Sequence, residues 1–266
     1  MGIIMKKVIC VFVCLAAMLQ GTVTTYAGER NPLVKRLRGT DGNSVLVLMY
    51  HRISKNDAEI NDFCIKPEEF EKDVNLLCEK GYTFLTATEL AECKRDTGEK
   101  FVAITFDDGY KSDYEYALPI LKKYSAKATF FVFGGAIGRA DYMTEKQLYE
   151  LAQSPNAEIG NHSFEIHNKS ILKVKQLYAS GKNNQQIVND FIKNKNVLEG
   201  ITKKKITALS YPNGVYNFTV DSMLRENGTM ITFSTEERIE RLPFSNRVIG
   251  RFNRGKRFNI CDYIAD

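Results

Sequence analysis

Short apolar runs alternate with amphipathic segments along most of the chain. Residues 45–50, 101–106 and 128–133 are mostly apolar runs, which is typical of strands buried on both faces of a sheet. Residues 67–80 instead repeat apolar positions every three or four residues, which predicts a helix. The same patterns predict further strands at 156–160, 206–211, 230–233 and 248–252, and helices opening at Thr86 and over 112–124, 144–153, 185–198 and 217–226.

This alternation predicts an α/β protein with a mostly parallel sheet, either open or closed into a barrel. With 266 residues and 44% hydrophobic residues, the chain is long enough for one such domain, and it has no internal repeat or linker that would indicate a second. In both architectures, ligands bind at the carboxyl ends of the strands. Polar residues that directly follow a predicted strand are therefore the first candidates for a functional site.

The N-terminal segment differs from the rest of the chain. Lys6 and Lys7 precede the apolar run 8–19, and a polar stretch follows that ends in an imperfect small-residue cleavage site at Ala27. This order is typical of a signal peptide, here predicted over residues 1–27, and a spanning helix would need roughly 20 apolar residues. An uncleaved anchor is the alternative, and both interpretations predict a secreted or cell-surface protein. Residues 28–42 are predicted to be a flexible tether, and residues 43–266 the folded domain.

The charge of the chain excludes few partners. The formal net charge is +5, and the predicted leader holds two lysines and no acid, which leaves +3 after its removal. Such a small excess does not indicate nucleic-acid binding, although it favours contact with an anionic cell wall. No feature indicates an oligomer, so we expect a monomer.

Four cysteines lie outside the leader: Cys64, Cys78, Cys93 and Cys261. An exported protein meets an oxidising environment, so disulfides are possible. However, Cys78 shares the apolar face of the predicted helix 67–80, where it would act as a small buried hydrophobe. The sequence therefore favours free thiols slightly, and the absence of a CxxC pair argues against a cysteine zinc site.

Two adjacent carboxylates follow the strand 101–106. Asp107 and Asp108 precede Gly109, and adjacent side chains at a strand end point in different directions. One aspartate would suffice to cap the following helix, so a second acid at the end of a buried strand indicates a further role.

Two of the three histidines of the chain, His162 and His167, lie just after another predicted strand. A lone histidine is more often structural, but a close pair in a histidine-poor chain favours a site. Two imidazoles and a carboxylate suit a catalytic zinc or similar divalent ion. Glu165, between the histidines, is interpreted as solvated or as a partner that orients one ring.

The motifs TFDDGY (105–110), NHS followed by His167 (161–167) and YPNGVYN (211–217) resemble the polysaccharide deacetylase group, also called NodB-homology or carbohydrate esterase family four. The resemblance covers residues 45–252. It implies that Asp107 is the catalytic base, and that Asp108, His162 and His167 hold one divalent metal, zinc or else cobalt, nickel or iron. It also implies that the N–H of Asn213, after Tyr211 and Pro212, binds an oxyanion.

Three departures from the common family pattern refine this assignment. The histidine spacing from 162 to 167 is wider than usual and is similar to the branch of biofilm poly-N-acetylglucosamine deacetylases. No arginine stands upstream of Pro212 to hold the base, so Arg251 is the candidate. No histidine follows His167, whereas His51 ends the first strand. In that branch the resemblance implies a circularly permuted, distorted (β/α) barrel of about seven parallel strands, with His51 as the general acid.

These residues predict an exported, metal-dependent hydrolase that removes N-acetyl groups from a GlcNAc polymer, either poly-N-acetylglucosamine or peptidoglycan. The alternatives are an O-acetyl esterase acting on a xylan-type polymer, and a non-catalytic carbohydrate-binding protein on the same fold. A phosphatase with two acids after a strand is disfavoured because no phosphate-binding loop is present. The candidates for stacking on sugars are Tyr110, Phe164, Tyr211 and Tyr216.

Overall fold

The computed structural model describes residues 44–93, 99–244, 247–258 and 260–264. The predicted signal peptide (1–27) and tether (28–42) lie outside the described residues. Within these ranges, no helix is long and apolar enough to cross a membrane.

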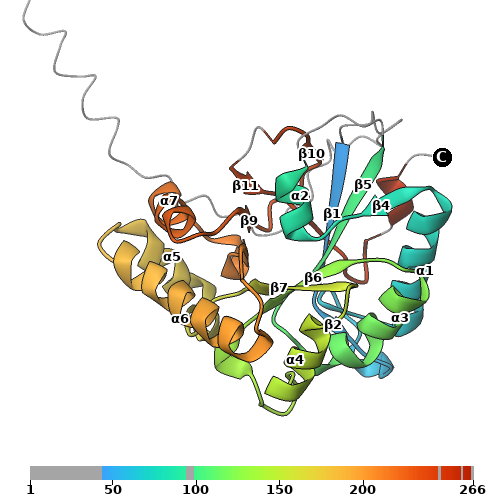
Figure 1. Cartoon of the computed structure of the whole chain (residues 1–266), viewed down its shortest axis with the longest axis horizontal. Helices are drawn as coiled ribbons and strands as arrows, with labels where there is room; N and C mark the ends of the chain where they lie inside the picture. Colours follow the sequence, from blue (N-terminus) through green and yellow to red (C-terminus); the bar gives the residue numbers. More distant parts are fainter. Residues whose placement is uncertain (1–43, 94–98, 245–246, 259, 265–266) are drawn as a thin grey trace, which may run out of the picture.

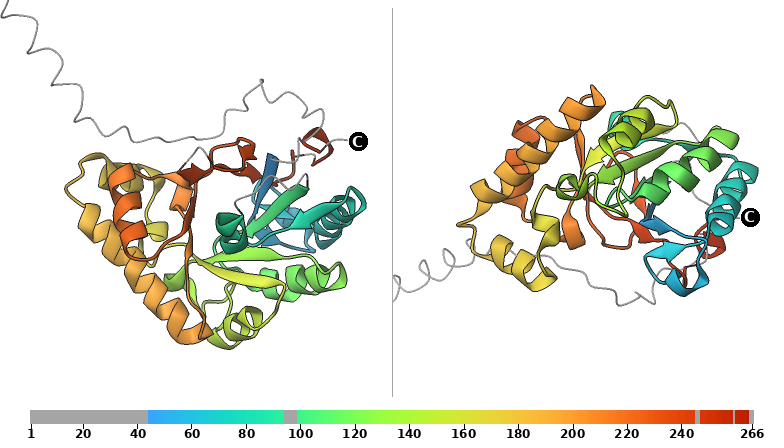
Figure 2. Two further views of the ribbon diagram at one scale, coloured as in Figure 1. Left: turned by 45° about the horizontal axis from the view of Figure 1, so that its top comes forward. Right: turned by 90° about the horizontal axis from the view of Figure 1, so that it is seen from below.

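One mostly parallel sheet forms a nearly closed barrel. Its strands are hydrogen-bonded in the order β1, β5, β6, β7, β8, β9 and β11, all parallel to their neighbours in this path. Their bounds are Ser44–Tyr50, Lys100–Phe106, Ala128–Val132, Ala157–Asn161, Ala208–Ser210, Ile231–Phe233 and Val248–Ile249. The next strand, β12 (Phe252–Asn253), pairs in parallel with β1 and so nearly closes the ring. Figure 2 shows these C-terminal strands, in red, beside the blue β1. The predicted distorted barrel of about seven parallel strands is confirmed.

Short strands flank this ring. β10 (Glu240–Arg241) pairs antiparallel with the start of β1, and β4 (Tyr82–Phe84) pairs with β5. Two further strands, β2 (Arg52–Ile53) and β3 (Cys64–Ile65), form a separate ribbon directly after β1.

Alternate residues of the central strands face two different cores, as the period of two in a strand requires. In β1, Val45 and Val47 pack with Phe101 and Phe233, in a cluster built mainly from the strands and the short helix α2 (Ala87–Glu92). The intervening Leu46 and Leu48 pack with the helices outside the sheet. Because β1 is buried on both faces, its sequence is an almost continuous run of apolar residues.

Helices cover the outside of the ring on two sides (Figure 1). One group follows the early strands and the other follows the later strands, and a 3-10 or π turn precedes or follows several of them. The first group is α1 (Pro67–Glu79), the π turn η2 (Asp113–Ala117), α3 (Leu118–Lys123) and α4 (Glu145–Ala152); the second is α5 (Ile171–Ala179), α6 (Asn184–Thr202) and α7 (Phe218–Glu226).

Local sequence signals place several helix ends where they were predicted. Thr86 caps α2 and Thr144 caps α4, each in a complete capping box with the residue three positions later. Helix α5 was not predicted, and two of its apolar residues, Ile171 and Leu172, remain exposed while Val174 and Tyr178 are buried. The thiols of Cys64, Cys78, Cys93 and Cys261 are free, and Cys78 packs against the core.

The strand predicted over residues 248–252 is in fact two strands, β11 and β12, separated by Gly250 and Arg251. At this point the Arg251 N–H donates to Glu236 O at 2.9 Å. A Cβ on Gly250 would lie 2.5 Å from the same carbonyl oxygen, so only glycine permits this close approach. The break turns the Arg251 side chain into the barrel end that holds the candidate site.

Candidate active site

The residues singled out in the sequence meet at the carboxyl ends of the parallel strands. Asp107 and Asp108 follow β5, and His162 follows β7. His51 follows β1, and Arg251 lies in the break before β12. The expected edge of the barrel is therefore the edge at which the candidate side chains gather.

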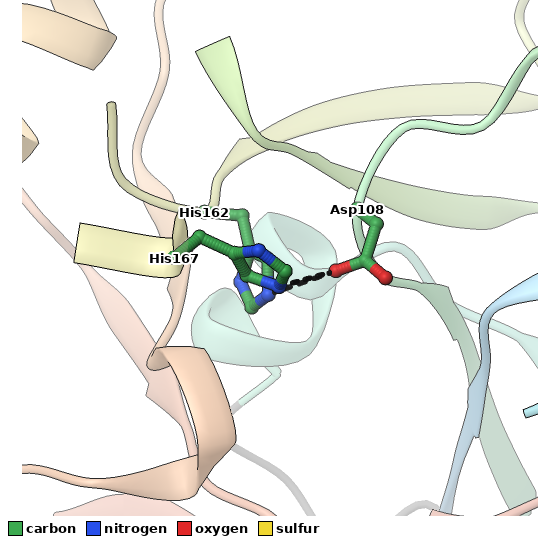
Figure 3. Close-up of side chains that lie close together, drawn as sticks. All are labelled: Asp108, His162 and His167. Carbon is green, nitrogen blue, oxygen red and sulfur yellow. Dashed lines mark ion pairs between the residues drawn. The ribbon is translucent and has the colours of Figure 1, made fainter. Parts of the chain in front are cut away.

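Asp108, His162 and His167 form a compact group (Figure 3), in which one ligand atom of each residue lies within 4.8 Å of the others. The Asp108 Oδ1 atom lies 2.8 Å from His167 Nε2 and 3.4 Å from His162 Nε2. Asp108 and His162 are buried, whereas the His167 side chain keeps 26% of its surface exposed. The group is thus reachable from solvent on the His167 side.

The hydrogen bonds of His162 show that this group fits a metal ion. His162 Nδ1 lies 2.9 Å from the carbonyl oxygen of Ser210, which can only accept, so Nδ1 carries the proton. In a neutral ring, Nε2 then presents a lone pair towards Asp108 Oδ1, itself a buried acceptor without a hydrogen-bond donor. Lone pairs that face each other in a buried place call for a cation between them. A nitrogen–nitrogen–oxygen set is one that zinc and similar divalent ions bind.

Arg251 holds Asp107 beside this triad. Its Nη1 and Nη2 donate to the two carboxylate oxygens of Asp107 at 2.8 and 2.7 Å, the fork geometry of a bidentate pair. Arg251 also donates to the Ser210 hydroxyl at 2.8 Å, and this hydroxyl donates to Asp107 at 3.2 Å. The guanidinium is fully buried, and Asp107 is 2% exposed. Asp107 Oδ2 lies 4.0 Å from His162 Nε2, so the carboxylate borders the triad.

The charges around the two aspartates keep both ionised. Burial alone would raise the pKa of Asp107, but Arg251 and the nearby imidazoles hold it below the ordinary value of 3.8. Burial acts in the same way on Asp108, and His162 and His167 hold its pKa well below 3.8. Conversely, burial would lower the pKa of His162, but the charges of Asp107 and Asp108 raise it above 6.5.

The backbone at three of these motifs adopts the left-handed region that residues other than glycine seldom occupy. Asp108 has a φ of 79°, Ser163 a φ of 68° and Asn213 a φ of 57°. After Asp108, Gly109 also has a positive φ, and a Cβ there would lie 3.0 Å from the Val132 side chain. Strain of this kind concentrates where the surroundings impose a geometry, and here it shapes each of the three motif turns.

Helix α6 fixes the loop that carries both histidines. Asn194, fully buried in α6, donates to Val132 O and to Asn161 Oδ1 at 2.9 and 2.8 Å. Asp190 accepts from the N–H groups of Phe164 and Glu165, both at 2.9 Å. The loop is therefore built on buried polar contacts, which preorganise the two imidazoles. Glu165 itself is exposed and pairs with Lys193, as its interpretation as a solvated residue requires.

His51 sits at the end of β1 with a buried Nδ1 that has no hydrogen-bond partner. Burial lowers its pKa below 6.5, although the charges of Asp108 and Asp107 act in the opposite direction. Phe63, which is 59% exposed, packs edge-on against the imidazole at a centroid distance of 5.0 Å. His51 thus faces the two aspartates under a partly exposed aromatic ring.

The turn after β8 needs one correction. Pro212, Asn213 and Gly214 form a 3-10 turn, η5, at the barrel edge. The Tyr211 ring, however, is fully buried, donates to Asp221 at 3.1 Å and stacks on Tyr216. The prediction that Tyr211 and Tyr216 stack on a sugar is wrong, because both rings belong to the hydrophobic core beside α6 and α7.

Ser210 is the site residue that the sequence did not reveal. Its carbonyl orients His162, and its hydroxyl lies between Asp107 and Arg251. The sequence feature that could have indicated its role is its position at the carboxyl end of a predicted strand, directly before the motif that begins at Tyr211. Thr105 contributes similarly, because its hydroxyl accepts from Arg251 at 3.0 Å.

The chain belongs to the polysaccharide deacetylase family, whose model matches residues 94–231. It is 34% identical over 194 residues to the putative polysaccharide deacetylase YxkH of Bacillus subtilis, covering 71% of this chain and 64% of that protein. It therefore spans just under two thirds of that relative. It is also 29% identical over 215 residues to the poly-beta-1,6-N-acetyl-D-glucosamine N-deacetylase of Staphylococcus aureus, covering 74% of this chain and 73% of that protein.

Solved structures of similar fold agree with this membership. IcaB from Ammonifex degensii superposes with a TM-score of 0.71 and 26% identity, covering 80% of this chain and 91% of that chain. The Streptococcus pyogenes deacetylase PplD superposes with a TM-score of 0.68, covering 80% of this chain and 93% of that chain. Its identity of 24% makes it a likeness of fold alone.

Proposed function

We propose that this protein is a metal-dependent N-deacetylase that removes acetyl groups from a polymer of N-acetylglucosamine. The observation that carries the proposal is the arginine-held carboxylate of Asp107, which borders the Asp108–His162–His167 triad. The similarity to the Staphylococcus aureus N-deacetylase supports poly-N-acetylglucosamine as the substrate class. Peptidoglycan is the second N-acetylated polymer to which the same chemistry applies.

Asp108, His162 and His167 would hold one divalent ion, with zinc as the first candidate and cobalt, nickel or iron as alternatives. When bound, such an ion polarises a carbonyl and lowers the pKa of water, which favours attack on an amide at neutral pH. Asp107 accepts the proton of the attacking water. Its low pKa keeps it ionised for this task, and the Arg251 fork keeps it in one orientation.

His51 donates a proton to the nitrogen that leaves. An amine is a poor leaving group unless it is protonated, so amide hydrolysis needs an acid on the side opposite the base. His51 follows β1, the strand next to β5; burial lowers its pKa, and the charges of Asp107 and Asp108 offset part of this effect in favour of the protonated form. No other histidine remains for this role, since the chain has only three.

The N–H of Asn213 stabilises the oxyanion that forms at the carbonyl. The turn η5 follows β8, whose last residue, Ser210, contacts Asp107 and His162. A backbone donor fixed in a turn needs no reorganisation as charge develops. The left-handed φ of 57° at Asn213 shows that this turn has a defined shape.

Acetate release from defined substrates tests the proposal. Purified protein, loaded separately with each candidate metal, is incubated with N-acetylglucosamine oligomers of β-1,6 and β-1,4 linkage and with O-acetylated xylan. We expect release from an N-acetylated oligomer and much less from xylan. Preferential release of acetate from xylan would contradict N-deacetylation and would indicate an O-acetyl esterase. Binding of the oligomers without release by any metal-loaded form would indicate a carbohydrate-binding protein instead.

We also propose that the chain is exported, on the basis of the predicted leader over residues 1–27. Its Lys6–Lys7 pair and the apolar run that follows support this. Fractionation of cells that express the full chain, with sequencing of the N-terminus of the recovered protein, tests the proposal. Recovery of the protein with an intact N-terminus from the cytoplasm alone would contradict it.

A further inference from the structure

A trio of aromatic side chains, Tyr110, Phe133 and Tyr142, lies beside the metal triad. Tyr110 and Tyr142 stack with their ring centroids 5.0 Å apart and their planes within 20°. Phe133 packs edge-on against Tyr142 at 6.4 Å and lies 4.9 Å from the ring of His167. Phe133 is buried, whereas Tyr110 and Tyr142 are half-buried and belong to none of the hydrophobic clusters that form the core of the described residues.

The backbone fixes this trio to the turn that carries Asp108. Tyr110 and Tyr142 form an isolated antiparallel bridge. On either side of it, the Lys111 N–H donates to Asp141 O at 2.9 Å and the Met143 N–H donates to Gly109 O at 3.2 Å. Residues 141–143 are therefore bound directly to the turn that follows the two aspartates. A displacement of Tyr142 relative to Asp108 would break these hydrogen bonds.

Tyr110 is the inner member of the stacked pair, because it lies two residues after Asp108 in the same turn. Both rings are half-buried, and residues 139–141, which precede Tyr142, are exposed. Asp141 also reaches across to Arg52, the residue after His51, with 3.9 Å between the charged atoms. The segment of Tyr142 and the segment of His51 thus face each other across the strand ends.

We propose that Tyr142, backed by Tyr110, is a sugar-binding residue that forms a subsite for the polymer next to Asp108. This inference rests on the proposed function, and it assigns one end of the substrate path. An aromatic ring offers an apolar face to the C–H groups of a pyranose, and the tyrosine hydroxyl offers a hydrogen bond to its polar rim. If packing against His167 were the only requirement, Phe133 would meet it alone, and a half-exposed stacked pair would be unnecessary.

Comparison of a polymer-like substrate with a minimal one tests this role. The variants are Tyr142→Ala, Tyr142→Phe and the control Tyr149→Ala, which removes a tyrosine that is 45% exposed on α4. The substrates are a tetrasaccharide of N-acetylglucosamine and a small chromogenic acetate ester, which is too short to span two sugar positions. The measured quantity is the ratio of kcat/KM for the tetrasaccharide to kcat/KM for the ester.

For Tyr142→Ala, we expect this ratio to fall roughly tenfold, through a rise in KM for the tetrasaccharide. Tyr142→Phe keeps the apolar face and should stay within about threefold of the parent protein, and Tyr149→Ala should equal the parent. An unchanged ratio for Tyr142→Ala would overturn the proposal. An equal loss on both substrates would also overturn it, because this would show a structural role at Asp108.

Direct binding separates this inference from the proposed function. Calorimetry with the tetrasaccharide measures its dissociation constant for the parent protein and for Tyr142→Ala without any turnover. Suppose that the parent protein releases acetate and that the parent and Tyr142→Ala have equal dissociation constants. The proposed N-deacetylase activity would then be supported, and the proposed subsite would be overturned. Suppose instead that no N-acetylated oligomer releases acetate and that Tyr142→Ala binds the tetrasaccharide about tenfold more weakly than the parent. The proposed N-deacetylase activity would then be overturned, and the proposed subsite would be supported.

Discussion

Arg251 and Asp107 stand 144 positions apart in the sequence and make two hydrogen bonds of 2.8 and 2.7 Å in the folded chain. Arg251 reaches Asp107 because β11 and β12 are separated by a break, and β12 then pairs with β1 to close the barrel. The C-terminal segment that completes the barrel thus supplies the group that orients the candidate base.

Removal of the guanidinium should damage both stability and activity. In Arg251→Met, Asp107 is left buried and unpaired, which we expect to lower the free energy of unfolding by about 3–5 kcal/mol. Urea denaturation measures this loss. The control is Arg251→Met combined with Asp107→Leu, which removes the unpaired charge and should recover much of the stability without activity. A single variant as stable as the parent would contradict the importance of this pair.

Ser210→Ala separates the positioning of the base from metal binding. The variant loses the hydroxyl between Asp107 and Arg251 but keeps the carbonyl that orients His162. We expect kcat/KM for acetate release to fall about tenfold, the value of one hydrogen bond to a charged group, with metal affinity within about threefold of the parent. Metal titration and steady-state kinetics provide the two measurements. A large loss of metal affinity would show that the hydroxyl acts on the triad instead.

Replacement of His51 should affect amides far more than activated esters. The amine of an amide must be protonated to leave, whereas a nitrophenolate leaves without help. We expect His51→Gln to slow N-deacetylation by roughly 10²–10⁴-fold and hydrolysis of a nitrophenyl acetate ester by less than about tenfold. Equal losses on both substrates would show that His51 has a role other than proton donation to the leaving group.

Asp113 provides a pH-dependent test of the fold outside the triad. This residue of η2 is fully buried, its Oδ2 atom has no hydrogen-bond partner, and burial raises its pKa well above 3.8. The folded state therefore keeps the proton, whereas the unfolded chain releases it as the pH rises above about 4. The protonated Asp113 side chain therefore contributes to the free energy of unfolding at low pH, and this contribution is lost as the pH increases.

Asp113→Asn removes this loss. The difference in unfolding free energy, variant minus parent, should grow in favour of asparagine from pH 4 upwards, by at most about 1.4 kcal/mol per pH unit, until the folded pKa is reached. Urea denaturation at a series of pH values measures it. Asp57→Asn, at an exposed surface acid, is the matched control for the same chemical change outside the core. A difference independent of pH would mean that Asp113 is ionised in the folded protein.

The strands and the chemical motifs were predictable because each depends on residues close together in the sequence. The apolar runs located β1, β5 and β6 within a residue or two, and the motifs located Asp107, Asp108 and the histidine pair. Contacts between distant segments were harder to predict. The break at Gly250 depends on a carbonyl from Glu236, and the buried state of Tyr211 depends on Asp221 and Tyr216. No local pattern encodes such contacts.

Arg251 and Ser210 illustrate the same limit within the site. Arg251 was inferred only because the upstream arginine of the family pattern was missing, and its fork on Asp107 emerges from barrel closure. Ser210 looks like an ordinary strand residue, yet it contacts Asp107, Arg251 and His162. Small polar residues at the carboxyl ends of parallel strands are therefore worth testing even when no motif includes them.

The central claim is that Asp107 is the base of a metal-dependent deacetylase, and Asp107→Asn tests it most directly. Bound metal per chain and acetate release from an N-acetylglucosamine oligomer are measured on the same preparation. We predict that the variant still binds one metal ion through Asp108, His162 and His167, while its acetate release falls by roughly 10²–10⁴-fold. A metal-loaded variant that releases acetate at the rate of the parent protein would contradict the account.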